Sequence, residues 1–258
     1  MGNTKRKRIT RFDLFKVFTA SFFMQAVWNF RSLLSIGFSL SFFPILDKLC
    51  STPQAKREFF QRHLKFFNAH PYFASFALGI SIRLEESRAS GDQDQSETID
   101  RLKELLIGPL GALGDRLFWA TIKPASLILG MIGIYLSPTI PFKILSLVLT
   151  FLLYNIPHFY YRYRGIIEGY EHPLDIYKFV SQNRFERVRK FFVILFAMSL
   201  AVFVLVYCNS MLNQDFRLIF IFLGSAVLAF ILEKYWKNFY LVTLVLFVFF
   251  IVIGMFLF

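Results

Sequence analysis

One carboxylate in this 258-residue chain lies where a charge is expensive. Asp115 belongs to the apolar, glycine-rich segment IGPLGALGDRLFWATIKP, residues 107–124. A carboxylate within a membrane is costly unless it is paired, and such residues commonly mark binding or transport sites. Asp115 is therefore the strongest candidate for a functional residue. The alternative is a salt bridge, either with the adjacent Arg116 or with a residue on another helix.

The other candidates are polar groups at the edges of apolar segments, where a few fixed donors and acceptors could bind a polar ligand. They are Asn68, His70, Glu85, Glu86 and Asn155, and Trp119 could stack on the ligand. Structural roles are open for each. His70 could cap a turn, Asn155 could satisfy a broken helix backbone, and Trp119 could pack or lie at headgroup level. Most acids between residues 85 and 104 could simply form a solvated face.

Patterns for catalysis or metal binding do not occur in the sequence. The four histidines are scattered without an HExxH-type pair, and Cys50 and Cys208 lie far apart without a CxxC spacing. Gly108, Gly111 and Gly114 follow no strand and precede no GK[ST], so they do not form a phosphate-binding loop. Their spacing instead predicts a helical face that another backbone can approach closely. We expect no catalytic residue, no metal and no cofactor on this chain.

Composition defines the environment of these residues. Hydrophobic residues make up 56% of the chain, 35 residues are Phe, and the mean hydropathy is +0.52, whereas soluble chains average roughly 45–50% apolar. The formal charge of +12 arises from basic clusters between long uncharged stretches, mainly at residues 5–16 and 162–190. This pattern is typical of a membrane protein with basic cytoplasmic loops. It excludes a soluble globular domain, and it argues against nucleic-acid binding, which needs basic residues on a polar domain.

The first fifty residues predict helices that do not span a membrane. The uncharged runs Val17–Phe30 and Ser32–Leu46 contain 14 and 15 residues, and a spanning helix needs about 20. We therefore expect interfacial or re-entrant helices, with a polar stripe that faces either the membrane interface or a partner helix. The stripe contains Ser21, Gln25, Asn29, Ser32, Ser35 and Ser39. No cleavage pattern follows the basic N-terminus, which we expect to be uncleaved and cytoplasmic.

The remainder of the chain predicts further helices. Ser51–Leu64 begins with a helix-entry sequence. Pro124–Leu136 and Phe142–Tyr154 predict either two tilted spans or a hairpin that re-enters the bilayer. The apolar C-terminal segments are Phe191–Leu212 and Phe239–Phe258, each long enough to span, and Leu218–Leu232 between them. The segment before Phe191 is rich in basic residues, the next loop has few, and the loop after that has more. Because cytoplasmic loops carry the excess of Lys and Arg, we expect the segment before Phe191 to lie on the cytoplasmic side.

These elements predict the fold class of an all-α integral membrane protein. N-terminal amphipathic, interfacial and re-entrant helices are followed by a transmembrane helical bundle. We assign residues 1–190 to an N-terminal and core region and residues 191–258 to the C-terminal transmembrane helices.

Three blocks occur in a fixed order along the chain. They are SFFMQAVWNFRSLLSIGFSLSFFPIL (Ser21–Leu46), RHLKFFNAHPYFASFALGISIRLEE (Arg62–Glu86) and IGPLGALGDRLFW, with a weaker fourth in LLYNIPHFYYRYRGIIEGY (Leu152–Tyr170). They resemble, respectively, the aromatic-x-Q-x-x-W-N opening, the FFNTHP block with its paired acids and the GPLAGIGDxxFW signature of the mannose/fructose/sorbose-family IID component of the bacterial sugar phosphotransferase system (PTS EIID). Ala69 replaces the Thr of the second block, and Arg116 replaces a small residue of the third. Arg116 would neutralise Asp115 and change what a pocket prefers.

The resemblance implies a multi-pass subunit of a mannose-type permease in the bacterial inner membrane. Its partners would be an obligate IIC subunit, in a higher oligomer of IIC–IID pairs, and the phosphocarriers IIB and IIA, with IIB phosphorylating a hexose-type sugar during import. No catalytic or phosphorylated residue is implied on this chain. The candidate sugar contacts are then Asn68, His70, Glu85, Glu86, Asp115, Trp119 and Asn155. The alternative is a non-transporting paralogue that acts as a membrane scaffold or regulatory subunit.

Overall fold

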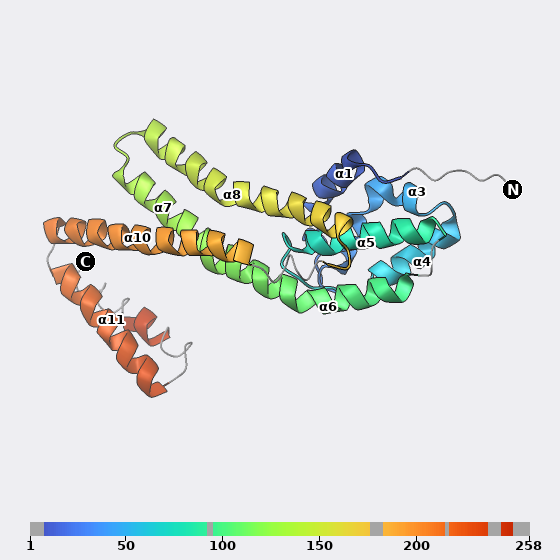
Figure 1. Ribbon diagram of the computed structural model, residues 1–258. Coiled ribbons are helices and arrows are strands. Elements are labelled where there is room, and N and C mark those ends of the chain that lie inside the picture. The colour runs from blue at the N-terminus through green and yellow to red at the C-terminus, as the bar shows by residue number, and fades with distance from the viewer. Residues whose placement is uncertain (1–7, 92–94, 176–182, 215–216, 237–243, 250–258) are drawn as a thin grey trace. The chain divides into compact units, whose positions relative to one another are not determined.

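The computed structural model describes residues 8–91, 95–175, 183–214, 217–236 and 244–249 (Figure 1). Within these ranges the regular elements are all helices, joined by turns and two isolated β-bridges. The predicted all-α class is confirmed. Contacts divide the chain into two compact units, Met1–Ser199 and Leu200–Phe258.

The first unit contains most of the helices. They are α1 (Arg11–Ser21), α2 (Ser35–Leu40), the 3-10 helix η1 (Phe43–Ile45), α3 (Leu46–Leu49), α4 (Pro53–His63), α5 (Ala74–Ala89), α6 (Ser96–Gly114), the π-helix η2 (Asp115–Ile122), α7 (Lys123–Leu136), α8 (Ile140–Glu171) and the first part of α10 (Asn183–Gln214). The second unit contains the end of α10 and α11 (Arg217–Trp236).

The predicted helix over residues 17–30 is wrong beyond Ser21, where α1 ends and turns begin. The side-chain oxygen of Asn29 accepts hydrogen bonds from the backbone N–H groups of Arg31 and Ser32, at 3.0 and 2.9 Å. Such bonds compete with helical ones. Leu33 then adopts a left-handed conformation with φ of 53°. The expected polar stripe is therefore divided between α1, the turns and α2.

The helix predicted over Ser51–Leu64 is confirmed as α4. The Thr52 side chain accepts a hydrogen bond from the Ala55 N–H at 3.1 Å, and Pro53 occupies the first helical turn, where its missing N–H costs nothing. This cap explains why the helix begins at this point.

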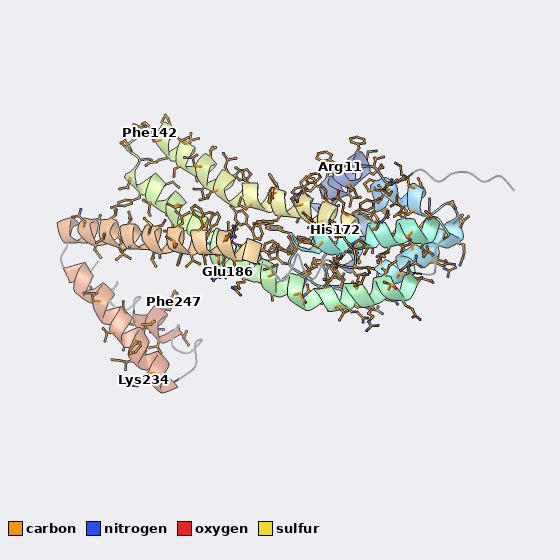
Figure 2. All side chains as sticks on the ribbon, in the orientation of Figure 1. Arg11, Phe142, His172, Glu186, Lys234 and Phe247 are labelled. Carbon is orange, nitrogen blue, oxygen red and sulfur yellow. The ribbon has the colours of Figure 1, made fainter. Side chains whose placement is uncertain are left out.

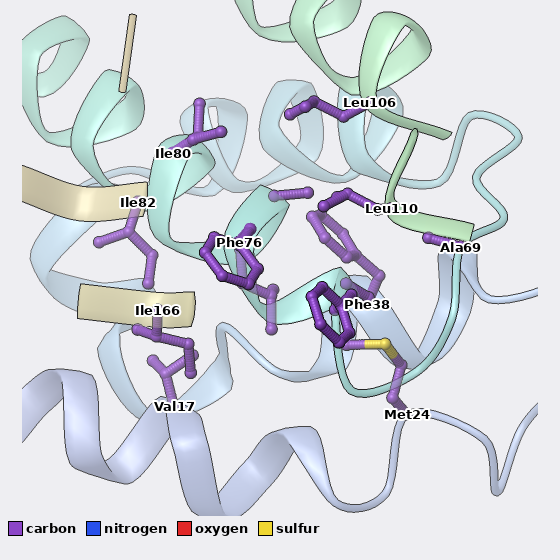
Figure 3. Packing of buried hydrophobic residues seen from close by; sticks show 14 of the residues in the cluster. Val17, Met24, Phe38, Ala69, Phe76, Ile80, Ile82, Leu106, Leu110 and Ile166 are labelled. Carbon is purple, nitrogen blue, oxygen red and sulfur yellow. The ribbon is translucent and has the colours of Figure 1, made fainter. Parts of the chain in front are cut away.

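The core of the first unit forms where α5 packs along the C-terminal half of α8. A Cβ added at Gly79 of α5 would lie 2.1 Å from the Ile166 carbonyl oxygen, and one at Gly169 of α8 would lie 2.3 Å from that of Phe76. Backbone approaches this close require glycine. Figure 3 shows Val17 of α1, Ile80 and Ile166 among the buried residues of this core.

The helices α6, η2 and α7 run continuously over Ser96–Leu136, a length of 41 residues, or roughly 60 Å at 1.5 Å per residue. α7 and α8 then form an antiparallel hairpin, in which the Ser146 hydroxyl donates to the Gly130 carbonyl at 3.3 Å. Most of the side chains around the turn are apolar and exposed, and Figure 2 shows them projecting from the helices near Phe142. An apolar surface of this kind faces lipid or another protein.

Among the described residues, three helices are long and apolar enough to cross a membrane: Ser96–Leu136, Ile140–Glu171 and Phe185–Ser210. The first two include both halves of the hairpin, which favours two spans over a re-entrant loop. The predicted span Phe191–Leu212 falls within α10, and Leu218–Leu232 falls within α11. Most of Phe239–Phe258 lies outside the described residues.

Candidate functional site

Two sequence blocks far apart in the chain meet in the first unit. His70, from the FFNAHP block, packs against the end of α6, where a Cβ added at Gly114 would lie 2.2 Å from the His70 Cβ. Glycine is therefore required at this crossing. Aromatic residues of η2 enclose the imidazole: the Phe118 ring stacks on it with centroids 5.5 Å apart, and the Trp119 ring meets it at an angle at 5.1 Å. The prediction that another backbone approaches a face formed by all three glycines is therefore wrong: Gly114 meets the His70 side chain, and an added Cβ at Gly108 or Gly111 would have no atom within 4 Å in the described structure.

The π-helix η2 determines which residues of the GDRLFW sequence face the core. Leu117 and Phe118 are buried, whereas Asp115, Arg116 and Trp119 are exposed. π-helical segments are rare and often occur at functional sites. Arg116 forms an ion pair with Glu186 of α10 at 2.8 Å rather than with Asp115. The carboxylate of Asp115 is therefore not neutralised by its neighbour.

His70 presents an unpartnered donor to the cluster. Its Nδ1 accepts a hydrogen bond from the Tyr72 backbone N–H at 3.3 Å, so the neutral ring carries its proton on Nε2. That nitrogen is buried and has no hydrogen-bond partner among the described residues. Burial, together with the charge of Arg162, lowers the pKa of His70 to about 4, so the ring is neutral near pH 7.

Tyr72 connects His70 to the apolar hairpin. The His158 ring stacks on Tyr72 with centroids 3.6 Å apart, and the Tyr72 and Tyr154 hydroxyls are 2.8 Å from each other. The Asn155 amide donates to the Phe151 carbonyl at 2.9 Å, and its oxygen lies 3.5 Å from His158 Nδ1. If that nitrogen donates, the buried Nε2 of His158, which has no partner in the described ranges, is an acceptor.

Arg162 holds three segments of the cluster together. Its guanidinium donates to the Ser21 carbonyl at 2.7 Å and to the Pro71 carbonyl at 3.4 Å, and it lies over the rings of Phe22 and Tyr72. It is buried, and it forms no ion pair with any carboxylate that the structure describes. A buried arginine bound to carbonyls fixes the positions of the ends that carry them.

The residues predicted from the sequence fall into three groups. His70, Trp119 and Asn155 belong to the cluster just described. Asn68 and Asp115 are exposed and lie next to members of the cluster in the sequence, and their side chains make no hydrogen bond in the described structure. Glu85 and Glu86 lie toward the opposite end of α5, roughly 16 Å of helix beyond its first residue. The structure thus separates the paired acids from the other candidates.

Glu85 is the centre of a buried ionic network. Arg62 binds both carboxylate oxygens at 3.0 and 3.1 Å, Arg88 donates at 3.1 Å, and His63 Nε2 lies 3.0 Å away. Burial alone would raise the pKa of Glu85, but the hydrogen bond from His63 and the two arginine charges hold it below its ordinary value. Lys103 donates to the carbonyls of Arg62 and His63 at 3.3 and 3.5 Å. These bonds fix α4 and α6 against α5.

Glu86 is also fully engaged. It accepts hydrogen bonds from the Ile9 N–H at 2.7 Å and the Tyr170 hydroxyl at 2.5 Å, and it pairs with Arg83 at 3.2 Å. These contacts tie the segment before α1 to α5 and α8. Neither acid offers a free oxygen that faces the cluster.

The sequence model of the family described as PTS system mannose/fructose/sorbose family IID component matches residues 8–257, nearly the whole chain. The chain belongs to this family. The mannose-specific EIID component of Escherichia coli K12 is 36% identical over 176 residues, 68% of this chain and 60% of that protein. The sorbose-specific EIID component of Lacticaseibacillus casei is 30% identical over 190 residues, 72% and 64% of the two chains. The chain therefore matches less than two thirds of the length of these relatives.

Two solved structures resemble this IID component. One is described as a membrane protein, with a TM-score of 0.67 and 31% identity over 77% of this chain and 71% of the other. The second is the cryo-EM complex of the mannose transporter ManYZ with microcin E492, with a TM-score of 0.60 and 26% identity over 88% and 97%. The fold and the apolar helices make this a membrane protein of a sugar-transport family.

The sequence did not predict three members of the cluster around His70, namely Tyr72, His158 and Arg162. His158 and Arg162 are four residues apart, which places them on the same face of a helix, and this spacing was the available signal. Ala69, the departure from the family's Thr, is buried in the core. Arg116, the other departure, lies on the exposed side of η2.

Burial of His63 predicts a loss of stability in mild acid. Its pKa is lowered from 6.5 to about 4, chiefly by burial. Between about pH 6.5 and about pH 4, His63 is protonated in the unfolded chain but neutral in the folded chain. The folded state therefore loses stability as the pH falls through this range. The loss from this residue amounts to about 3 kcal/mol. Thermal unfolding of wild type and His63→Gln across this range should give a shallower pH dependence for the variant; parallel curves would contradict the assignment.

Proposed function

We propose that this chain is the IID subunit of a mannose-type permease, which works with a IIC membrane subunit to carry a hexose-type sugar that IIB phosphorylates during import. The observation that carries the proposal is the meeting of two family blocks at His70 and Gly114. It brings neutral hydrogen-bonding groups and aromatic rings together beside an exposed carboxylate and indole. Donors and acceptors among aromatic walls suit an uncharged, polyhydroxylated ligand.

Within this proposal the sugar-contacting residues are those of the cluster and its exposed edge. His70 supplies a neutral donor, Trp119 an aromatic face, and Asp115 an acceptor. Asn68 and Asn155 stay in the proposal as neighbouring amides. We assign Glu85 and Glu86 to structural networks, because their oxygens are already bound. No residue on this chain is expected to carry the phosphoryl group, which passes from IIA through IIB.

The apolar hairpin formed by α7 and α8 supports a membrane partner. None of the apolar stretch of Ile140–Glu171 is buried within the chain itself, and such a surface is stable only against lipid or another apolar protein. We assign part of it to the IIC subunit, which would make the pair obligate and allow assembly into larger oligomers. From the basic residues before α1 and around Arg164 we infer that the N-terminus and this end of α8 lie on the cytoplasmic side.

Asp115→Asn should lower phosphoenolpyruvate-dependent sugar uptake at least tenfold while leaving the amount of protein unchanged. The residue is exposed and unpaired in the described structure, so its loss removes a ligand contact rather than a structural one; a hydrogen bond to a charged group is worth about 1.5–3 kcal/mol. Uptake in a strain that lacks the chain, complemented by each variant, measures the effect. Glu104→Gln, an exposed acid earlier on the same continuous helix, is the matched control.

The complementation assay also separates the proposed function from its alternative. If deletion of the chain leaves uptake of every mannose-type sugar unchanged, the transport role is wrong and a scaffold or regulatory subunit replaces it. If Asp115→Asn transports normally, the position of the sugar site is wrong although the transport role stands.

A further inference from the structure

A pocket adjoins the His70 cluster on the side of Phe118, whose ring centroid is 6.2 Å from that of Tyr161, and it lies between α5, α8 and the beginning of α10. Its volume is about 350 Å³, at the small end of the roughly 300–1,000 Å³ typical of ligand sites. Aromatic rings form the walls, from Phe76, Tyr160, Tyr161 and Phe185. The Phe185 and Tyr161 centroids are 5.3 Å apart, and Phe76 and Phe185 are buried. These contacts give the pocket a rigid apolar base.

The charges of the described residues that line the pocket sum to one positive charge. Arg164 is paired with Glu168, which is buried, and these two groups neutralise each other. Arg187 also lines the pocket, is exposed, and forms no ion pair with any residue in the described ranges. Among its described residues, the pocket therefore combines one uncompensated guanidinium with aromatic walls. A phosphodiester, which carries a single negative charge, matches that charge, and a guanidinium binds phosphate oxygens well.

The place of the pocket along the chain indicates where such a phosphodiester would come from. Apart from Phe76 of α5, its residues belong to two helices that are long enough to span, α8 and α10, at the ends that adjoin the basic residues of 162–190. The apolar part of each helix continues away from the pocket, through Phe151 in α8 and through Ile194 in α10, both exposed. Lipid chains could follow these surfaces while the headgroup occupies the pocket. Basic pockets between spanning helices on the cytoplasmic side bind anionic headgroups.

We propose that this pocket binds the phosphodiester headgroup of an anionic phospholipid, with Arg187 as the anion contact and the Tyr160 and Tyr161 rings in the walls. The site goes beyond the sugar-transport function, since it needs only membrane insertion of the chain. A bound lipid would connect α8 to α10 across their cytoplasmic ends.

The test uses the full chain purified in detergent, titrated with short-chain phosphatidylglycerol and followed by native mass spectrometry. Arg187→Gln should weaken phosphatidylglycerol binding about fivefold, the value of one basic residue near an anionic lipid. Lys190→Gln removes the same charge one turn further along α10, from an exposed position that does not line the pocket, and should bind as wild type does. Val188→Trp, which fills the pocket without changing its charge, should also prevent binding.

Four outcomes would overturn the assignment. Equal weakening by Arg187→Gln and Lys190→Gln would show diffuse surface attraction. Equal binding of zwitterionic phosphatidylcholine would show that the charge is not selected. Displacement of the lipid by inorganic phosphate would make this a site for the free anion, and displacement by mannose would make it a sugar site. None of these outcomes depends on whether the chain supports sugar uptake.

Discussion

Replacement of Gly114 by alanine is expected to destabilise the chain by about 1–3 kcal/mol, the usual cost of overpacking a buried contact. The added methyl group would lie 2.2 Å from the His70 Cβ and 2.3 Å from its Cγ. His70 cannot move aside easily, because Phe118 and Trp119 lie against its ring. The helix and the turn that carry the two family blocks must therefore separate, and sugar uptake should fall with the amount of folded protein.

The same helix supplies matched controls for this experiment. Gly108 and Gly111 have no atom within 4 Å of an added Cβ in the described part of the chain. Alanine there should be neutral or stabilise the helix by roughly 0.5–1 kcal/mol, because alanine is the better helix former. Thermal unfolding of the three single variants in detergent makes the comparison. If all three behave alike, the crossing at His70 is not as close as the structure has it.

Glu85→Gln should cost about 3–5 kcal/mol, the range for removing one partner of a buried ion pair. The amide keeps the shape of the side chain but leaves Arg62 and Arg88 with no anion in the described network. The contacts between α4 and α5 should weaken, and the variant should unfold at lower temperature or fail to accumulate. Asp47→Asn is the surface control: Asp47 pairs with Lys56 at 2.6 Å and is exposed, so its loss should cost at most about 1 kcal/mol.

The same experiment decides whether Glu85 is a structural residue or a substrate contact. A Glu85→Gln chain that unfolds like wild type but no longer supports uptake would make Glu85 a substrate contact and contradict the structural assignment made above. A destabilised chain whose remaining folded fraction transports normally is the result we expect.

Local signals predicted the helices well where capping and length determine them. Thr52 and Pro53 mark the beginning of α4, and long uncharged runs mark α8 and α10. The segment after Ser21 could not be predicted in this way. Its apolar residues continue at helical spacing, but the Asn29 side chain and the left-handed Leu33 redirect the backbone, and no periodicity reports either of them.

The candidate site was predictable only in part, for a physical reason. His70 and Trp119 could be selected because they border apolar segments. Arg162 appeared to belong to a basic loop, yet it is buried and binds carbonyl groups 141 and 91 residues away in the chain. The sequence suggested that Glu85 borders a pocket, but in the structure it binds Arg62 and His63, which belong to another helix, α4. Such contacts depend on tertiary packing, which residue spacing does not contain.

The most direct test of the proposed function is affinity purification of the tagged chain from membranes of cells that also express its IIC candidate, followed by sugar-binding measurements on the product. We expect the IIC subunit to copurify in a fixed ratio, the complex to bind a mannose-type sugar, and Asp115→Asn to preserve the complex while weakening sugar binding at least tenfold. A chain that purifies without IIC, or a complex whose sugar affinity is the same in wild type and Asp115→Asn, would contradict respectively the partnership and the site.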